Sequence, residues 1–176
     1  MTSLEPCPDC RALLPPADGP THRYIGASSA CWTLYSNLLN GGEPPLAPSP
    51  YNTLLVDAYA AQHPGVPSDQ AIQSVAVHTL TLYGVLERGV GMERALWLRL
   101  RPLREQRTTK RGRFHWLIPP SFADTITIAD IVALPTPAAR SEKVKAYVEQ
   151  VWGCWAQAHR GTIATWYAAY VLPDIL

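Results

Sequence analysis

Three cysteines and two histidines near the start of the chain have the types and spacing of a metal site. Cys7 and Cys10 are separated by two residues, so both thiolates can reach one ion from a single tight turn. A structural zinc ion takes four protein ligands, and Cys31 is the obvious third. The fourth is either His22, which gives the pattern Cys-x2-Cys-x11-His-x8-Cys, or His63. The residues therefore predict zinc with two alternative fourth ligands.

The expected compartment favours a metal over other uses of these thiols. The first ten residues have neither a basic start nor an apolar run, and the most apolar segment, 162–176, is too short to span a membrane. We therefore predict a cytoplasmic protein with no membrane association, where close cysteine pairs bind metals more often than they form disulfides. A redox-active pair is disfavoured because no βαβ pattern surrounds it. Reduced cysteines that bind nothing are the remaining alternative.

A second candidate site combines one carboxylate with two imidazoles. His78 and His159 lie on helix faces that otherwise carry Val, Leu and Trp, where a histidine is usually a core residue with one hydrogen-bond partner. If their helices are neighbours, both can meet Asp57 in the middle of the bundle. Neutral imidazole and carboxylate suit acid–base catalysis or a second metal site. Trp152 and Trp155 would line the adjoining pocket, which suits a planar or partly apolar ligand.

The one marked charge asymmetry is the segment Arg99–Arg113, which holds seven of the fifteen Lys and Arg residues. Phosphate or a nucleic-acid backbone would bind such a segment. A solvated loop is the favoured interpretation, because no aromatic residue is interleaved before Phe114 and no reading helix is evident. The chain also lacks a glycine-rich phosphate loop, a nucleophile elbow and a His-Glu-x-x-His motif.

Composition indicates a globular protein of about one domain. Of the 176 residues, 47% are apolar and 16% are charged, and the net charge of +1 gives no general attraction to nucleic acid or anionic membranes. We predict a mainly α fold, a small bundle of about five helices over 29–172. A loop-rich, metal-tied N-terminal segment, 1–28, would pack on this bundle within a single domain, 1–176.

Start and stop signals define the helices that must position the candidate residues. Ser28 or Ser29 and Ser68 are candidate N-caps, and Ser49 precedes a proline at the first helical position. Apolar residues then recur at spacings of three and four. The predicted helices cover about 29–40, 50–63, 68–89, 92–101 (ending at Pro102) and 141–172 (starting at Ser141, with a bend at Gly161). A short strand or extended segment is expected over 114–118, and a capping box over 127–130.

Several short segments occur together in a combination that is typical of one protein family. They are Cys7-Pro8-Asp9-Cys10, Cys31-Trp32, the run from Val56-Asp57-Ala58-Tyr59 to Gln62-His63-Pro64-Gly65, Ser74 to His78, and Trp152…Trp155…His159. The combination resembles a family of small bacterial proteins catalogued as a domain of unknown function, over nearly the whole chain. The resemblance implies that Cys7, Cys10, Cys31 and His63 belong to one recurring set, which favours His63 over His22. Arg11 stands where such zinc knuckles commonly carry glycine.

Two classes of function are consistent with these observations. In the first, a zinc-stabilised helical protein binds a protein partner or a small ligand without catalysis; it is favoured because no known catalytic signature appears. In the second, a small metal-dependent or His/Asp-dependent enzyme has a Trp- and Tyr-lined pocket between its helices. The surroundings of His78 discriminate between them. If core groups satisfy both ring nitrogens and no cavity adjoins the ring, the enzyme interpretation loses its main support.

Overall fold

The computed structural model describes residues 3–108 and 114–172, and these residues are mainly helical, as predicted. A two-stranded antiparallel hairpin opens the chain, with Glu5 opposite Leu14 and Pro6 opposite Leu13. Six α-helices follow within the described residues, one more than expected because the predicted capping box starts a five-residue helix. The elements are β1 (Glu5–Pro6), β2 (Leu13–Leu14), α1 (Ser29–Leu39), η1 (Pro50–Leu54), α2 (Leu55–Gln62), α3 (Asp69–Leu86), η2 (Met92–Arg94), α4 (Ala95–Thr108), α5 (Ile128–Val132) and α6 (Pro137–Tyr170).

Side-chain caps fix the starts of two helices at the predicted positions. The Ser28 hydroxyl accepts from the backbone N–H of Cys31 at 3.2 Å, and Ser68 does the same for Ala71 at 3.2 Å. Each bond satisfies one of the free N–H groups in the first turn of its own helix. Ser49 makes no such bond, because the chain there enters the 3-10 turn η1 before α2 begins at Leu55.

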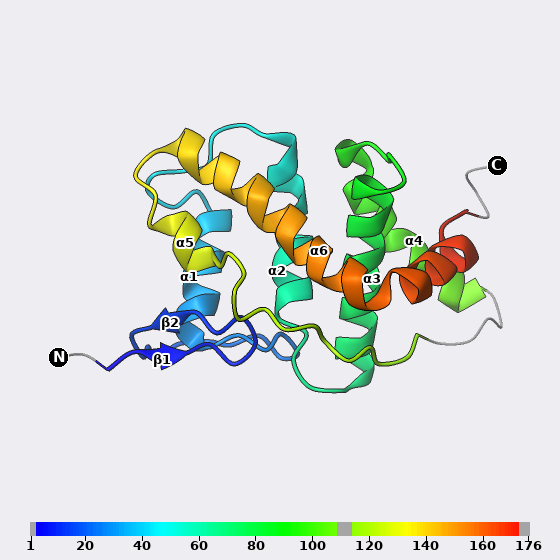
Figure 1. Cartoon of the computed structure of the whole chain (residues 1–176), viewed down its shortest axis with the longest axis horizontal. Helices are drawn as coiled ribbons and strands as arrows, with labels where there is room; N and C mark the ends of the chain where they lie inside the picture. The colour runs from blue at the N-terminus through cyan, green and yellow to red at the C-terminus, as the bar shows by residue number, and fades with distance from the viewer. Residues whose placement is uncertain (1–2, 109–113, 173–176) are drawn as a thin grey trace.

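Two predicted helix boundaries are wrong. Pro102 lies inside α4, which continues to Thr108; a proline removes one helical hydrogen bond, but Leu98 and Arg101 beside it are buried and their packing retains the helix. The helix α6 begins at Pro137 and not at Ser141, because Thr136 caps it through the N–H of Ala139 at 3.3 Å. It then runs unbroken through Gly161, and Figure 1 shows its axis bending in the orange-to-red part.

The long helix α6 lies across α2 and α3 and packs against both (Figure 1). The helix α4 packs on α3 at one end of the molecule, whereas α1 contacts α5 near the hairpin at the other. This arrangement places α2 in the interior, where seven of its eight residues are buried. The buried apolar residues form one cluster that extends from the hairpin cysteines to Tyr170 and Val171.

The segment expected as a short strand or extended chain, 114–118, forms no strand and follows α6 instead. Phe114 contacts the rings of Trp166 and Tyr170 with centroid distances of 4.9 Å, and Leu117 is buried. Aromatic packing therefore replaces strand pairing in this segment. Among the described helices, none combines the length and the apolar character needed to cross a membrane.

Candidate metal centre and the neighbouring cleft

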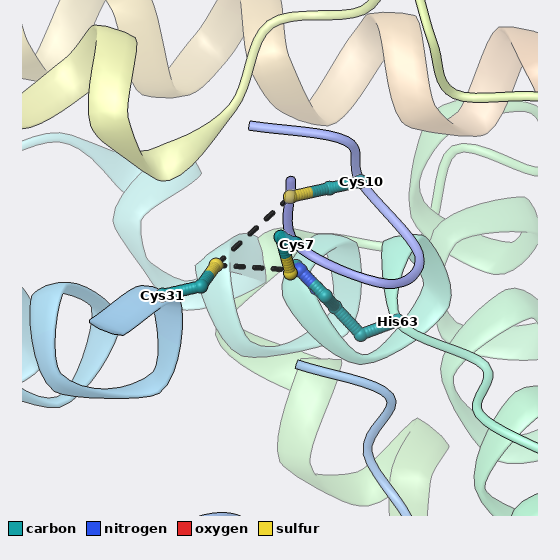
Figure 2. A group of neighbouring side chains, drawn as sticks. All are labelled: Cys7, Cys10, Cys31 and His63. Atoms are coloured by element: carbon teal, nitrogen blue, oxygen red, sulfur yellow. Dashed lines mark hydrogen bonds between the residues drawn. The ribbon is translucent and has the colours of Figure 1, made fainter. Parts of the chain in front are cut away.

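Three segments far apart in sequence bring four potential metal ligands together. Cys7 and Cys10 lie in the turn of the hairpin, Cys31 in the first turn of α1 and His63 at the C-terminal end of α2, and their side chains point toward one another (Figure 2). Their ligand atoms all lie within 4.8 Å of one another. We call this group the Cys3His cluster.

The spacing of these atoms suits one tetrahedral ion. The Sγ atoms of Cys10 and Cys31 are 3.9 Å apart, and Cys31 Sγ is 3.5 Å from His63 Nε2. Zn–S and Zn–N bonds of about 2.3 and 2.0 Å imply ligand separations of roughly 3.5–3.8 Å in a tetrahedron. All four side chains are at most 1% exposed. The cluster can therefore hold a metal ion with four protein ligands away from solvent.

The hairpin turn holds its two cysteines through its own backbone. The N–H of Cys7 donates to the carbonyl of Ala12 at 2.8 Å, and the N–H of Arg11 donates to the carbonyl of Cys7 at 3.1 Å. Arg11 adopts φ +64°, the left-handed conformation that normally favours glycine. The turn thus has the backbone conformation of a zinc knuckle although the glycine is replaced.

One backbone bond fixes the orientation of the His63 ring. Nδ1 of His63 lies 2.9 Å from the carbonyl oxygen of Tyr59, one helical turn earlier. A carbonyl can only accept, so Nδ1 carries a hydrogen and Nε2 is the nitrogen that faces the sulfurs and can ligate an ion.

Hydrogen bonds also reach the sulfurs. The N–H of Ser28 donates to Cys7 Sγ at 3.4 Å, and the Tyr59 hydroxyl donates to Cys31 Sγ at 3.6 Å. Such donors stabilise negative charge on sulfur. Ser28 therefore has two tasks, since its hydroxyl caps α1 while its amide contacts a cysteine.

The protonation of the cluster reflects this crowding. Hydrogen bonds from Cys10 and Cys31 lower the pKa of the Cys7 thiol, whereas bonds to Cys10 and Cys7 together with burial raise that of Cys31. Burial alone would lower the pKa of His63, but hydrogen bonds and charge from Cys10 and Cys7 raise it to about 9. One thiolate, on Cys7, is thus favourable in the cluster, whereas ionisation of the Cys31 thiol is opposed. A bound cation would remove that opposition.

A second set of contacts ties the hairpin to the loop after α2. Asp9 Oδ2 accepts from the N–H of Gly65 at 2.7 Å, and the N–H of Gly26 donates to the carbonyl of His63 at 3.2 Å. Burial raises the pKa of Asp9, although the bond from Gly65 opposes this rise. Gly65 has φ +70°, and a Cβ there would lie 2.7 Å from the carbonyl oxygen of Tyr24. These contacts require glycine at position 65.

The alternative fourth ligand, His22, is not among the residues of the cluster. Its ring contacts Tyr24 and Trp32 with centroid distances of 4.5 and 4.9 Å, and burial lowers its pKa. Within the described residues, the structure therefore brings His63 and not His22 to the three cysteines.

Two of the three predicted acid–base residues meet. His78 Nδ1 lies 2.8 Å from Oδ1 of the fully buried Asp57. Arg99 holds the other side of the same carboxylate, with Nε 2.9 Å from Oδ1 and Nη2 2.7 Å from Oδ2. His159 lies elsewhere, because its Nε2 is 2.7 Å from the carbonyl oxygen of Ile118. The neighbouring helices α3 and α6 thus do not place both histidines against Asp57.

The two tryptophans expected to line a pocket are core residues with satisfied indoles. Trp155 is fully buried and donates to the carbonyl of Ala61 at 2.9 Å, and Trp152 donates to Glu87 at 3.0 Å. Neither lines the cavities described beside His78. The cavity beside His78 is lined instead by residues of the N-terminal segment, α1, α2 and α3.

The basic segment is partly helical and partly used inside the fold. Arg99 binds Asp57, and Arg101 forms a 2.8 Å ion pair with Glu105 one turn later. The prediction of a solvated loop is therefore wrong for residues up to 108, which belong to α4. Lys110, Arg111 and Arg113 lie outside the described residues.

Sequence reasoning missed the partners of these sites. The sequence assigns Arg99 to the basic segment, because no local signal links it to a carboxylate 42 residues away. Tyr59 belongs to the run from Val56 to Gly65 that carries the family resemblance, so the sequence marked this residue but not its contact with Cys31. Asp9 lies between the two hairpin cysteines, where its role as an acceptor for Gly65 was open to prediction.

Fold and site together define a mainly helical protein with a buried cluster of three cysteines and one histidine that can hold a metal ion. The chain belongs to a family of unknown function (DUF5946), whose model matches residues 5–156. The matched range contains the Cys3His cluster, Asp57 and His78, and it ends before His159. No curated protein and no solved structure matches the chain.

Proposed function

We propose that the Cys3His cluster binds a structural zinc ion, which ties the N-terminal segment to the helical bundle as one domain. The observation that carries this proposal is the closed, four-ligand geometry with every ligand atom buried. Catalytic zinc keeps an open coordination position, whereas a structural site uses four protein ligands. Tetrahedral sites made of thiolate and imidazole suit zinc. The ion would replace a core that the loop-rich N-terminal segment cannot build.

The role of the whole protein in this proposal is to bind a small ligand or a protein partner without catalysing a reaction. A cytoplasmic location fits four cysteines that are all free thiols. The zinc ion would hold one wall of a cleft beside His78, because Trp32 of that wall follows Cys31 directly and Ala60 lies three residues before His63.

Metal analysis of variants tests the zinc proposal. Protein purified without added metal should contain about one zinc ion per chain, as expected for a closed site. Cys7→Ser and His63→Ala should lower the zinc content and loosen residues 3–31 in hydrogen exchange. The matched controls, Cys154→Ser on α6 and His22→Ala, should keep zinc at the level of the unmodified protein. Substoichiometric metal that is unchanged by Cys7→Ser would refute the site.

The Asp57–His78 pair supports a second candidate function, acid–base catalysis in the cleft. A carboxylate that fixes one imidazole nitrogen and leaves the other toward a cavity is an arrangement used by general bases. Hydrolysis of 4-nitrophenyl acetate tests the reactivity of this imidazole. The rate should fall in His78→Asn and not in His159→Asn. Equal rates in both variants would remove the support for catalysis.

A further inference from the structure

We propose that the cleft beside His78 binds a small, uncharged, planar ligand that donates an O–H or N–H hydrogen to Nε2 of His78. The inference rests on the ligand-binding part of the proposed function, and it names the chemical class of the ligand. Phenols and azoles belong to this class.

The cleft consists of two adjoining cavities of about 190 and 180 Å³. Both are lined by Tyr24, Ser74 and His78, so they meet at these residues. The first lies between α1, α2, α3 and the N-terminal segment, and the second continues along α3. Pockets for drug-sized molecules have roughly 300–1,000 Å³. Each cavity therefore suits a ligand of about one ring.

The imidazole of His78 is held so that one nitrogen faces a ligand. Arg99 donates to both oxygens of the Asp57 carboxylate, so this group acts as an acceptor toward its neighbours. Nδ1 of His78 thus carries a hydrogen toward Asp57, and in the neutral form of the ring Nε2 carries the lone pair. Nε2 makes no hydrogen bond within residues 3–108 and 114–172, and the side chain is 18% exposed. Asp57 is itself 0% exposed and fixed on both sides, so the acceptor is preorganised.

The charges around the cleft favour an uncharged ligand. Among the described residues that line the two cavities there is no Lys, Arg, Asp or Glu. The nearest carboxylate, Asp57, is already neutralised by Arg99. The aromatic rings of the lining also contact one another, since Tyr35 and Tyr59 stack with centroids 3.7 Å apart and planes 3° apart, and Trp32 lies 4.9 Å from the His22 ring. A charged ligand therefore finds no side chain of opposite charge among the described lining residues.

Two further hydroxyls of the lining are available to a ligand. Tyr35 and Ser74 line the same cavity as His78, and neither hydroxyl forms a hydrogen bond within the described part of the chain. Burial and the charge of Asp57 raise the pKa of Tyr35, so its hydroxyl stays a donor. Trp32, Val56 and Ile25 supply the apolar part of the lining. A planar ring with one donor edge is complementary to this surface.

Titration with phenol and with anisole tests the proposal, because the two probes share the ring and only phenol has a donor hydrogen. Binding is followed by NMR, with chemical-shift changes mapped onto the cleft. Phenol should bind about two- to tenfold more tightly than anisole, the effect of one hydrogen bond. In His78→Asn, the amide nitrogen can still donate to Asp57 but no acceptor remains at the Nε2 position, so the preference should disappear. His159→Asn is the matched control and should keep it.

Each outcome decides the proposal. Equal affinities for the two probes, an undiminished preference in His78→Asn, shift changes away from the cleft, or no binding of either probe would overturn it. If phenol and anisole bound at the cleft with equal affinity, the hydrogen bond to His78 would be refuted, but the broader proposal that the cleft binds a small ligand would stand. The zinc content of every sample separates this result from the metal proposal. A preference for phenol in zinc-free protein would refute only the proposed role of zinc. No preference for phenol in zinc-loaded protein would refute only the proposal of a hydrogen-donating ligand.

Discussion

Gly65→Ala perturbs the loop that joins the metal cluster to the rest of the fold. The residue has φ +70°, which costs an L-residue about 1–2 kcal/mol. The new Cβ would lie 2.7 Å from the carbonyl oxygen of Tyr24, so the backbone must shift. That shift weakens the bond from Gly65 N–H to Asp9 or the bond from Gly26 N–H to His63, which adds about 1–3 kcal/mol. We expect a total loss of about 2–4 kcal/mol in the free energy of unfolding after the smaller unfolded-state entropy of alanine is included.

Gly89→Ala is the matched control for this prediction. Gly89 has φ +69°, but a Cβ there would meet no atom within 4 Å. The variant therefore carries the backbone strain alone, and its unfolded state changes in the same way. Urea unfolding followed by tryptophan fluorescence at fixed free zinc measures both free energies. Gly65→Ala should be about 1–3 kcal/mol less stable than Gly89→Ala, which is the cost of the hydrogen bonds. Equal losses would show that the contact with Tyr24 is relieved without cost and would refute the reasoning.

Two further variants test the buried polar contacts by the same urea measurement. Tyr147→Phe removes the donor that satisfies the buried Gln62 carboxamide oxygen at 2.9 Å, so we expect a loss of about 1–3 kcal/mol. The exposed bond between Tyr51 and Glu149 is its control, and Tyr51→Phe should change stability by about 0.5 kcal/mol or less. Asp57→Asn leaves the Arg99 guanidinium, 21% exposed, without its anion and should cost about 2–4 kcal/mol. A change within about 0.5 kcal/mol would mean that water replaces the carboxylate without cost.

The helix starts show which structural features are local enough to be predicted from sequence. Ser28 and Ser68 cap their helices through the N–H of a residue three positions later, so the signal and the structure lie in the same short segment. Thr136 followed by proline carries the same kind of signal, and it was open to prediction. The predicted start is Ser141, but the hydroxyl of this residue donates to the carbonyl of Ala47 at 2.7 Å, a partner 94 residues away. Cap chemistry alone does not tell these two uses of a hydroxyl apart.

The histidines mark the corresponding limit at the candidate sites. The spacing of Cys7 and Cys10 by itself determined that two thiols share one turn, and with Cys31 it indicated a metal. The choice of His63 over His22 came from the family resemblance, and the packing of the hairpin on the end of α2 places His63 beside the thiols.

Likewise, the helical pattern put both His78 and His159 on apolar faces, but only tertiary structure decided which one reaches Asp57. Residue spacing fixes a side chain's direction around its own helix axis. How far two helices slide along each other depends on the summed packing of all their side chains, and this sum fixed the positions of Asp57, His78 and Arg99.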